Sequence, residues 1–261
     1  MSTGRTLARW ARMYVNGYDL SGDIRTIGPL AHLTDIEEME GLDWEIKGGL
    51  PGTTTISVGA LNSMLNSDGT TKMHDLFNAP GSNYPVMVPI GIRAAPAQGD
   101  PCFCAQVNEL GYAGEIAINS MALNLTFGGK PATTVLNHKK PWGVLLHAKA
   151  AKTAANTAAG ADGLASSAYG GFMMYQIFAV SGTGTVEIKV QEADTNSNAN
   201  FADLTGATSG AIAHTATPTG GIVQLAITAA VKRYLRWQIE LTGITSVTFA
   251  LGFVRSQAHN V

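Results

Sequence analysis

The stretch TVEIKVQEA at residues 185–193 decides the fold, because its apolar and polar side chains alternate with the period of a β-strand. Val186, Ile188 and Val190 share one face, and the polar side chains between them point to the other. This pattern is typical of a strand that packs one face on a core and exposes the other to water. It predicts β-structure in the C-terminal half of the chain.

Segments of similar character lie on both sides of this strand, with turn residues between them. We expect further strands at residues 12–20, 53–64, 84–93, 100–114, 115–129, 142–151, 170–182, 221–230, 232–241 and 246–255. Residues 72–78 are predicted to form a short helix. Many short strands at regular spacing indicate an all-β protein, and the C-terminal set favours a β-sandwich.

The chain is expected to divide into two domains. Residues 128–142 mix Gly, Pro and Lys after a strand end, which is typical of a linker. We place the linker at residues 130–142, between a domain at 13–129 and a second domain at 143–261. Residues 1–12 are predicted to form an N-terminal arm.

The charge content is low and nearly balanced. Charged residues make up 14% of the chain, and its formal net charge is −2. Residues 1–142 carry ten Lys/Arg against thirteen Asp/Glu (−3), and residues 143–261 carry seven against six (+1). The sequence therefore lacks the basic patch with which proteins hold nucleic acid. A low charge density suits large contacts between subunits, because each charge in an interface needs a partner.

Motifs of membrane proteins, metal proteins and enzymes were sought without success. No segment approaches eighteen apolar residues, so no membrane span is predicted. No apolar block follows Arg5, Arg9 and Arg12, so no signal peptide is predicted either. Cys102 and Cys104 lie two positions apart and are expected to be buried thiols without a mutual disulfide. The segment 194–204 places Asp and Asn at alternate positions like a calcium loop, but it lacks that loop's Gly and Glu, so we interpret it as a turn. No catalytic motif is present, and we predict neither enzymatic activity nor a cofactor.

Two segments of opposite charge are candidates for contacts between copies of the chain. The arm carries the basic residues Arg5, Arg9 and Arg12. The segment 35–45, which we expect to be a loop, carries the acidic residues Asp35, Glu37, Glu38, Glu40, Asp43 and Glu45. Opposite charges on two surfaces favour docking between subunits. The alternative is that the two segments are unrelated and solvated.

Several motifs resemble those of siphophage tail-tube (major tail) proteins. These are MYVNGYDLSGDI at 13–24, a loop ending in Leu50–Gly52, the strand Ile56–Ala60, HDLF at 74–77, PVMVPIG at 85–91 and MALNLTFGG at 121–129. The C-terminal half is similar to a β-sandwich appended to some phage tail proteins.

The resemblance implies a fold and a role. The fold would be a split barrel or β-sandwich with a short helix, followed by an Ig-like or jelly-roll-like sandwich on the tube exterior. The role would be that of a virion protein, made in the host cytoplasm, whose rings of six copies stack into a tube and work with the tape-measure and terminator proteins. Genomic DNA would pass through without specific binding.

Two other functions remain open on the sequence alone. One is a capsid decoration protein. The other is a carbohydrate- or receptor-binding module, because β-sandwiches commonly carry such sites. Its candidate aromatic residues would be Trp142, Tyr169 and Trp237.

Overall fold

A computed structural model describes the fold. It covers residues 10–22, 24–33, 36–40, 45–49, 53–61, 77, 81–92, 94–117, 120–129 and 141–256. The chain divides into two compact units. Unit 1 comprises Met1–Ser21, Pro85–Ala105 and Trp142–Val261, and unit 2 comprises Gly22–Tyr84 and Gln106–Pro141. Every strand pairing described is antiparallel, and the all-β prediction is confirmed.

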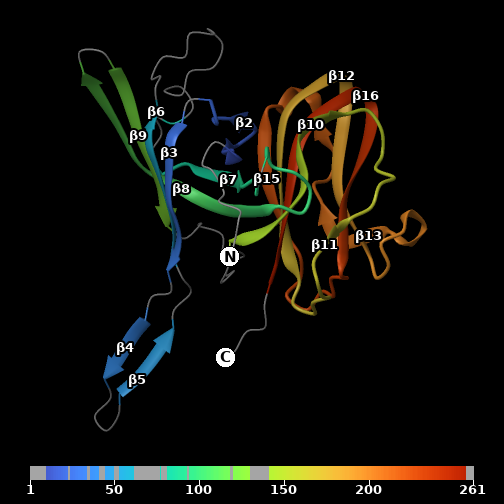
Figure 1. Cartoon of the computed structure of the whole chain (residues 1–261), viewed down its shortest axis with the longest axis horizontal. Helices are drawn as coiled ribbons and strands as arrows, with labels where there is room; N and C mark the ends of the chain where they lie inside the picture. Colours follow the sequence, from blue (N-terminus) through green and yellow to red (C-terminus); the bar gives the residue numbers. More distant parts are fainter. Residues whose placement is uncertain are drawn as a thin grey trace. The chain divides into compact units, whose positions relative to one another are not determined.

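Unit 1 is a sheet of long and short strands (Figure 1). Its main strands are β7 (Asn83–Pro89, which begins in unit 2), the first part of β8 (Pro101–Ala117), β10 (Trp142–Lys152), β12 (Gly171–Ala193) and β16 (Tyr234–Arg255). The shorter ones are β1 (Tyr14–Val15), β2 (Tyr18–Asp19), β11 (Ala161–Asp162), β13 (Ala202–Thr208), β14 (Ile212–Ala213) and β15 (Thr219–Gln224). Two 3₁₀ turns lie at Asn198–Asn200 and His214–Ala216.

The long strands β12 and β16 form a ribbon that folds back on itself. They pair from Gly171 with Arg255 to Ala193 with Tyr234, with register shifts between Ile177 and Thr185. The rings of Trp237 and Phe249 lie 5.6 Å apart although both belong to β16. A straight strand would separate them by about 40 Å, at about 3.3 Å per residue. The ribbon therefore supplies both layers of a β-sandwich.

The core of the sandwich lies between these two layers. Val186, Ile188 and Val190 are fully buried and pack in one cluster with Met173 and Phe253 from the other half of the ribbon. The alternation at 185–193 therefore predicted the buried face correctly. Burying an aliphatic side chain of this size contributes about 1.5–3 kcal/mol, so this cluster stabilises unit 1.

The N-terminal hairpin β1–β2 belongs to unit 1. Asn16 and Gly17 have φ values of 47° and 82°, which are typical of the two-residue type I′ turn that Asn-Gly favours. A Cβ on Gly17 would lie 2.3 Å from Thr219 N, so only glycine fits against β15. Strand β1 also pairs with β7, with Tyr14 opposite Met87.

The two compact units are not consecutive stretches of the chain, unlike the two domains expected from the sequence. Residues 13–21 and 85–105, which the sequence analysis assigned to the first domain, pack with 142–256. The reason is that β8 and β10 pair directly, with Trp142 opposite Phe103. Of the predicted linker, only Pro141 and Trp142 fall within the described residues, and Trp142 begins a strand.

Unit 2 contains a sheet with the strand order β3–β6–β9–β8. Its strands are β3 (Ile24–Leu33), β6 (Thr53–Leu61), β9 (Ser120–Gly129) and the second part of β8. Phe77, Tyr84 and Phe127 pack edge to face, with ring centroids 5.4–6.3 Å apart. Phe77 is the one described residue of the predicted helix at 72–78, so that prediction lies outside the described part of the chain.

The acidic segment of unit 2 is a hairpin and not the loop that we expected. Strands β4 (Ile36–Glu40) and β5 (Glu45–Gly49) pair with each other in a separate two-stranded sheet. Figure 1 shows them in blue, labelled β4 and β5. The antiparallel pairing satisfies part of the backbone groups of these residues, which a solvated loop would leave to water.

Candidate functional site

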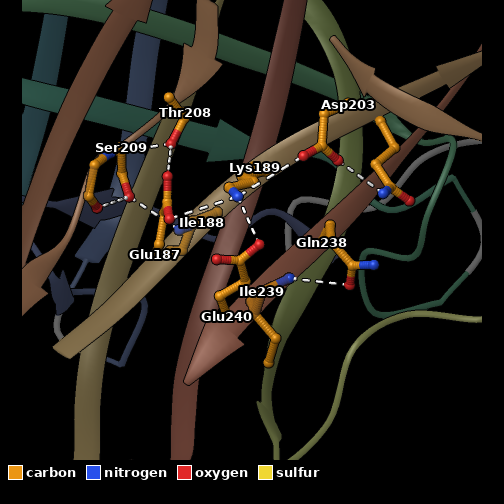
Figure 2. Close-up of polar contacts among 11 residues, drawn as sticks. Glu187, Ile188, Lys189, Asp203, Thr208, Ser209, Gln238, Ile239 and Glu240 are labelled. Carbon is orange, nitrogen blue, oxygen red and sulfur yellow. Dashed lines mark hydrogen bonds and ion pairs between the residues drawn. The ribbon is translucent and has the colours of Figure 1, made fainter. Parts of the chain in front are cut away.

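A group of charged side chains lies on the polar face of the β13–β12–β16 sheet (Figure 2). Lys189 of β12 is at its centre, because the alternation that buries Ile188 turns Lys189 outward. Its Nζ lies 2.6 Å from Glu240 Oε1, 3.5 Å from Glu187 Oε2 and 3.7 Å from Asp203 Oδ2. We call these four residues the Lys189 cluster.

Neighbouring polar groups orient the carboxylates of the Lys189 cluster. Thr208 donates a hydrogen bond to Glu187 at 2.5 Å, and Gln191 donates one to Asp203 at 2.8 Å. The hydrogen bond with Glu240 is the largest cause that raises the pKa of Lys189. The ammonium group is therefore held in its charged form, which makes it unsuitable as a nucleophile or a base.

A second polar group lies nearby and includes a buried arginine. Arg236 of β16 is only 4% exposed, and its guanidinium donates hydrogen bonds to Gln191, to Asn198 and to the carbonyl of Ala158. The ring of Phe201 lies 4.2 Å from Arg236 Cζ, at cation–π distance. Burial lowers the pKa of Arg236. The arginine therefore connects two loops to the sheet through neutral partners.

The segment interpreted as a turn rather than a calcium loop uses its side-chain oxygens within the chain. Asn196 Oδ1 accepts from the backbone N–H of Gly160 at 2.7 Å, and Asn198 Oδ1 accepts from Arg236 at 2.7 Å. Among the residues that the structure describes, no group of three or more His, Cys, Asp or Glu could hold a metal ion. No helix in that part of the chain is long and apolar enough to cross a membrane.

The two cysteines are buried neighbours. Cys102 and Cys104 are free thiols whose sulfur atoms lie 3.5 Å apart, on the same face of β8. Burial raises the pKa of the Cys102 thiol, and the neighbouring Cys104 adds to this effect. The Cys102 thiol is therefore a poor nucleophile and a poor ligand, and both buried cysteines contribute to packing.

The candidate sugar-binding aromatics do not form one surface. Trp237 is 7% exposed and packs against His147, with ring centroids 4.8 Å apart. Trp142 and Tyr169 are 42% and 44% exposed. Trp142 is held edge to face by Phe103. A buried Trp237 cannot stack on a ligand.

The predicted intersubunit residues are described only in part. Arg5, Arg9, Asp35 and Asp43 lie outside the described residues. Arg12 is half-buried in unit 1, where its backbone N–H donates to the carbonyl of Pro89 at 3.0 Å. In the hairpin of unit 2, Glu38 pairs in register with Lys47, and Glu40 with Glu45, while Glu37 lies opposite Gly48.

One buried carboxyl group could not be anticipated from the sequence. Glu109 on β8 is 1% exposed, and neither of its carboxylate oxygens has a hydrogen-bond partner among the residues that the structure describes. Burial raises the pKa of Glu109. The neighbouring letters VNEL at 107–110 resemble an ordinary half-exposed strand, so no local signal marks this residue.

Comparison with known proteins finds distant structural similarities, among them the following two. No family model and no curated protein matches the sequence. One similar structure is the SPP1 Dit (gp 19.1) protein, described as a paradigm of the hub adsorption apparatus in phages that infect Gram-positive bacteria; it is 11% identical and has a TM-score of 0.33. The match covers 94% of this chain and 99% of that one. The other is the phage p2 baseplate in its activated conformation with Sr, at 9% identity, a TM-score of 0.33 and coverage of 94% and 98%. At these scores neither similarity carries an inference about this chain.

Proposed function

We propose that the chain is a structural, non-enzymatic virion protein and, more specifically, a tail-tube subunit of a long-tailed bacteriophage. Copies would join into rings, and stacked rings would form the conduit through which DNA leaves the particle. The motif resemblance within residues 13–129 is the basis of this proposal. The proposal includes both the general role of a virion protein and the specific role of a tube subunit.

One structural observation supports assembly through strand pairing. Within the described residues, the ten-residue strand β3 pairs with β6 alone, so its other edge is open. Proline is confined to edge strands and bulges, and Pro29 lies within β3, where the register with β6 shifts between Ile27 and Leu30. A long open edge promotes association unless another chain covers it. A neighbouring copy that adds a strand there would cover it.

The charge distribution supports a conduit that does not hold DNA. Residues 1–142 carry a net charge of −3, and each copy in a ring adds the same charge. Every phosphate contact by a basic side chain would add salt-sensitive affinity and slow the passage of DNA. An acidic ring has the opposite effect.

The proposed contact between copies joins the basic arm to the acidic hairpin. Arg5 and Arg9 of one copy would lie against β4–β5 of the next, whereas the backbone of Arg12 is already bonded within its own unit. Such a contact is heterologous, so it closes around a ring or continues along a tube. The surrounding charges would steer association and would be sensitive to salt.

Negative-stain electron microscopy with time-resolved light scattering tests the proposal. We expect the purified chain to form hollow tubes of constant width. A chain without residues 2–9 keeps the bonded residues 10–12, so it should fold normally and polymerise poorly. Small closed oligomers that bind empty heads would indicate a decoration protein instead, and monomers that bind a glycan array would indicate a receptor-binding module.

A charge-swap pair separates the arm contact from general effects on folding. Replacing Arg5 and Arg9 by Glu should block assembly, and replacing Glu37 and Glu38 by Lys should also block it. A mixture of the two variants should assemble, because every contact between unlike copies regains opposite charges when the two variants alternate. Normal tubes from both single variants would show that these residues do not form the contact.

A further inference from the structure

The chain contains a single Asn-Gly dipeptide, at the tip of the β1–β2 hairpin. Asn-Gly is the dipeptide most prone to spontaneous deamidation, because glycine leaves the following nitrogen unhindered. The backbone nitrogen of Gly17 loses its proton and attacks Cγ of Asn16. The new C–N bond forms as the Cγ–Nδ2 bond breaks, and ammonia leaves. Water then opens the cyclic imide to aspartate or isoaspartate.

In the folded chain the nucleophile of this reaction, the Gly17 backbone nitrogen, is held in a hydrogen bond. The Gly17 N–H donates a hydrogen bond of 2.5 Å to Gln176 Oε1, and both groups are buried. A base must remove this proton before the nitrogen can attack, and a buried, hydrogen-bonded N–H exchanges only when the structure opens. Gln176 is itself fixed, because its Nε2 donates to the carbonyl of Pro85 at 2.9 Å.

The side chain that carries the electrophile, Cγ of Asn16, is also fixed by a hydrogen bond. The backbone N–H of Gly220 donates to Asn16 Oδ1 at 3.1 Å, which restrains the rotation that would bring Cγ toward the Gly17 nitrogen. Gly17 itself is tightly packed. A Cβ at this residue would lie 2.3 Å from Thr219 N and 2.5 Å from Ile177 O, so the turn lies directly on the main chain of β15 and β12.

We propose that Asn16–Gly17 is a latent deamidation site. It stays unreactive as long as the hairpin is docked on Gln176 and Gly220. Asn16 then converts only in chains whose N-terminal hairpin has opened. Isoaspartate inserts an extra methylene into the main chain of a two-residue turn, and the turn type sets the register of the hairpin. A hairpin that carries isoaspartate cannot dock again in the same register, so this product stays in chains that have opened.

Peptide mass spectrometry can follow this reaction directly. Trypsin cleaves after Arg12 and Arg25 and releases residues 13–25, in which Asn16 is the only asparagine. The folded chain is incubated at mildly alkaline pH beside the same chain in denaturant. We expect conversion in the folded chain to be slower by on the order of tenfold or more, since the rate follows the population of the open hairpin. Equal rates would overturn the proposal.

A variant pair tests the role of Gln176. Gln176→Met keeps the side-chain length but removes the acceptor for Gly17, so Asn16 should convert faster in a chain that circular dichroism shows to be folded. Gln98→Met is the matched control, because the Gln98 side chain is exposed and bonds only to the carbonyl of Ala159; its rate should equal that of the wild type. An unchanged rate in folded Gln176→Met would refute the role of this hydrogen bond.

Discussion

Trp142 lies opposite Phe103 in the register of β10 and β8, and their rings meet edge to face with centroids 5.2 Å apart. The pair joins the first strand of the C-terminal half to a strand from the first half. Strands β7 and β1 follow in the same sheet and bury Met87 and Val15 completely. The C-terminal half is therefore not a complete sandwich without residues 10–21 and 85–105.

A fragment of residues 142–261 should consequently fail to fold alone. It retains the core of the β12–β16 ribbon but exposes the edge of β10 and the apolar face that β7 and β8 cover. We expect no cooperative thermal transition and poorly dispersed amide resonances. Co-expression with residues 1–129 should restore both. A fragment that melts cooperatively at the temperature of the full chain would contradict this prediction.

His147 should make the stability of unit 1 depend on pH. Its ring stacks on Phe249 with centroids 4.2 Å apart, and its Nδ1–H donates to the carbonyl of Phe249 at 3.0 Å. Burial lowers the pKa of His147 to about 4. The unfolded chain takes up a proton near pH 6.5, whereas the folded chain does so only near pH 4, so stability is lost as the pH falls between these values.

The size of that loss follows from the difference in pKa. It should reach about 3 kcal/mol at the acidic end of the range. His147→Phe keeps a ring against Phe249 and cannot be protonated, so its unfolding free energy should change little over the same range, apart from the effects of other groups. Chemical denaturation at several pH values measures both chains. Parallel profiles for the two would exclude His147 as the cause.

Lys189 should stabilise the sheet by separating three carboxylates. Lys189→Met leaves Glu187, Asp203 and Glu240 together without their cation. Because solvent screens the cluster, we expect a loss of up to about 1 kcal/mol at low salt, which should diminish as salt is added. Adding Glu240→Gln to this variant should recover part of the loss.

A second lysine provides the control for this measurement. Lys232 pairs with Asp194 at 3.0 Å, but both side chains are largely exposed. Lys232→Met should therefore cost less than Lys189→Met, and its effect should show little dependence on salt. If the two lysines behave alike, the Lys189 cluster has no special role in stability.

Gly252 should be intolerant of a side chain because it faces the two thiols. A Cβ there would lie 2.8 Å from Cys104 Sγ and 3.3 Å from Cys102 Sγ. Gly252→Ala should therefore destabilise unit 1 by about 1–3 kcal/mol, the usual cost of overpacking a core. Adding Cys104→Ala removes the closest atom and should recover much of the loss.

The matched control for Gly252 is Gly22→Ala. A Cβ on Gly22 would meet no atom within 4 Å, so this change should be close to neutral. Thermal unfolding of the single and double variants gives the coupling between positions 252 and 104. Additive effects would mean that the alanine and the thiol do not compete for the same space.

Local patterns in the sequence predicted local structure well. The alternation at 185–193 identified the buried and exposed faces of β12, because side-chain direction in a strand depends only on position. The spacing of Cys102 and Cys104 likewise predicted two thiols on one face. The docking of the hairpin could not be predicted in this way, because Gln176 is 159 positions from Gly17.

The same distinction applies to the candidate sites. The sequence identified Lys189 as part of a polar face, but its partner Glu240 lies 51 positions away on another strand. The acidic segment at 35–45 was expected to be a loop because its many charged side chains obscure the pattern of the two short strands β4 and β5. The contact of that segment with Arg5 and Arg9 remains a prediction.

Unit 1 is built from three separate stretches of the chain, and this affects how the nascent chain folds on the ribosome. Residues 13–21 emerge early, but Gly220, which bonds to Asn16, emerges 204 positions later. At about 5–20 residues per second, the hairpin waits roughly 10–40 seconds for the strand on which it docks. During translation the nascent chain therefore presents the hairpin and β7 to chaperones without the C-terminal strands on which they pack, whereas the strands of unit 2 have all been synthesised before those of the C-terminal half begin.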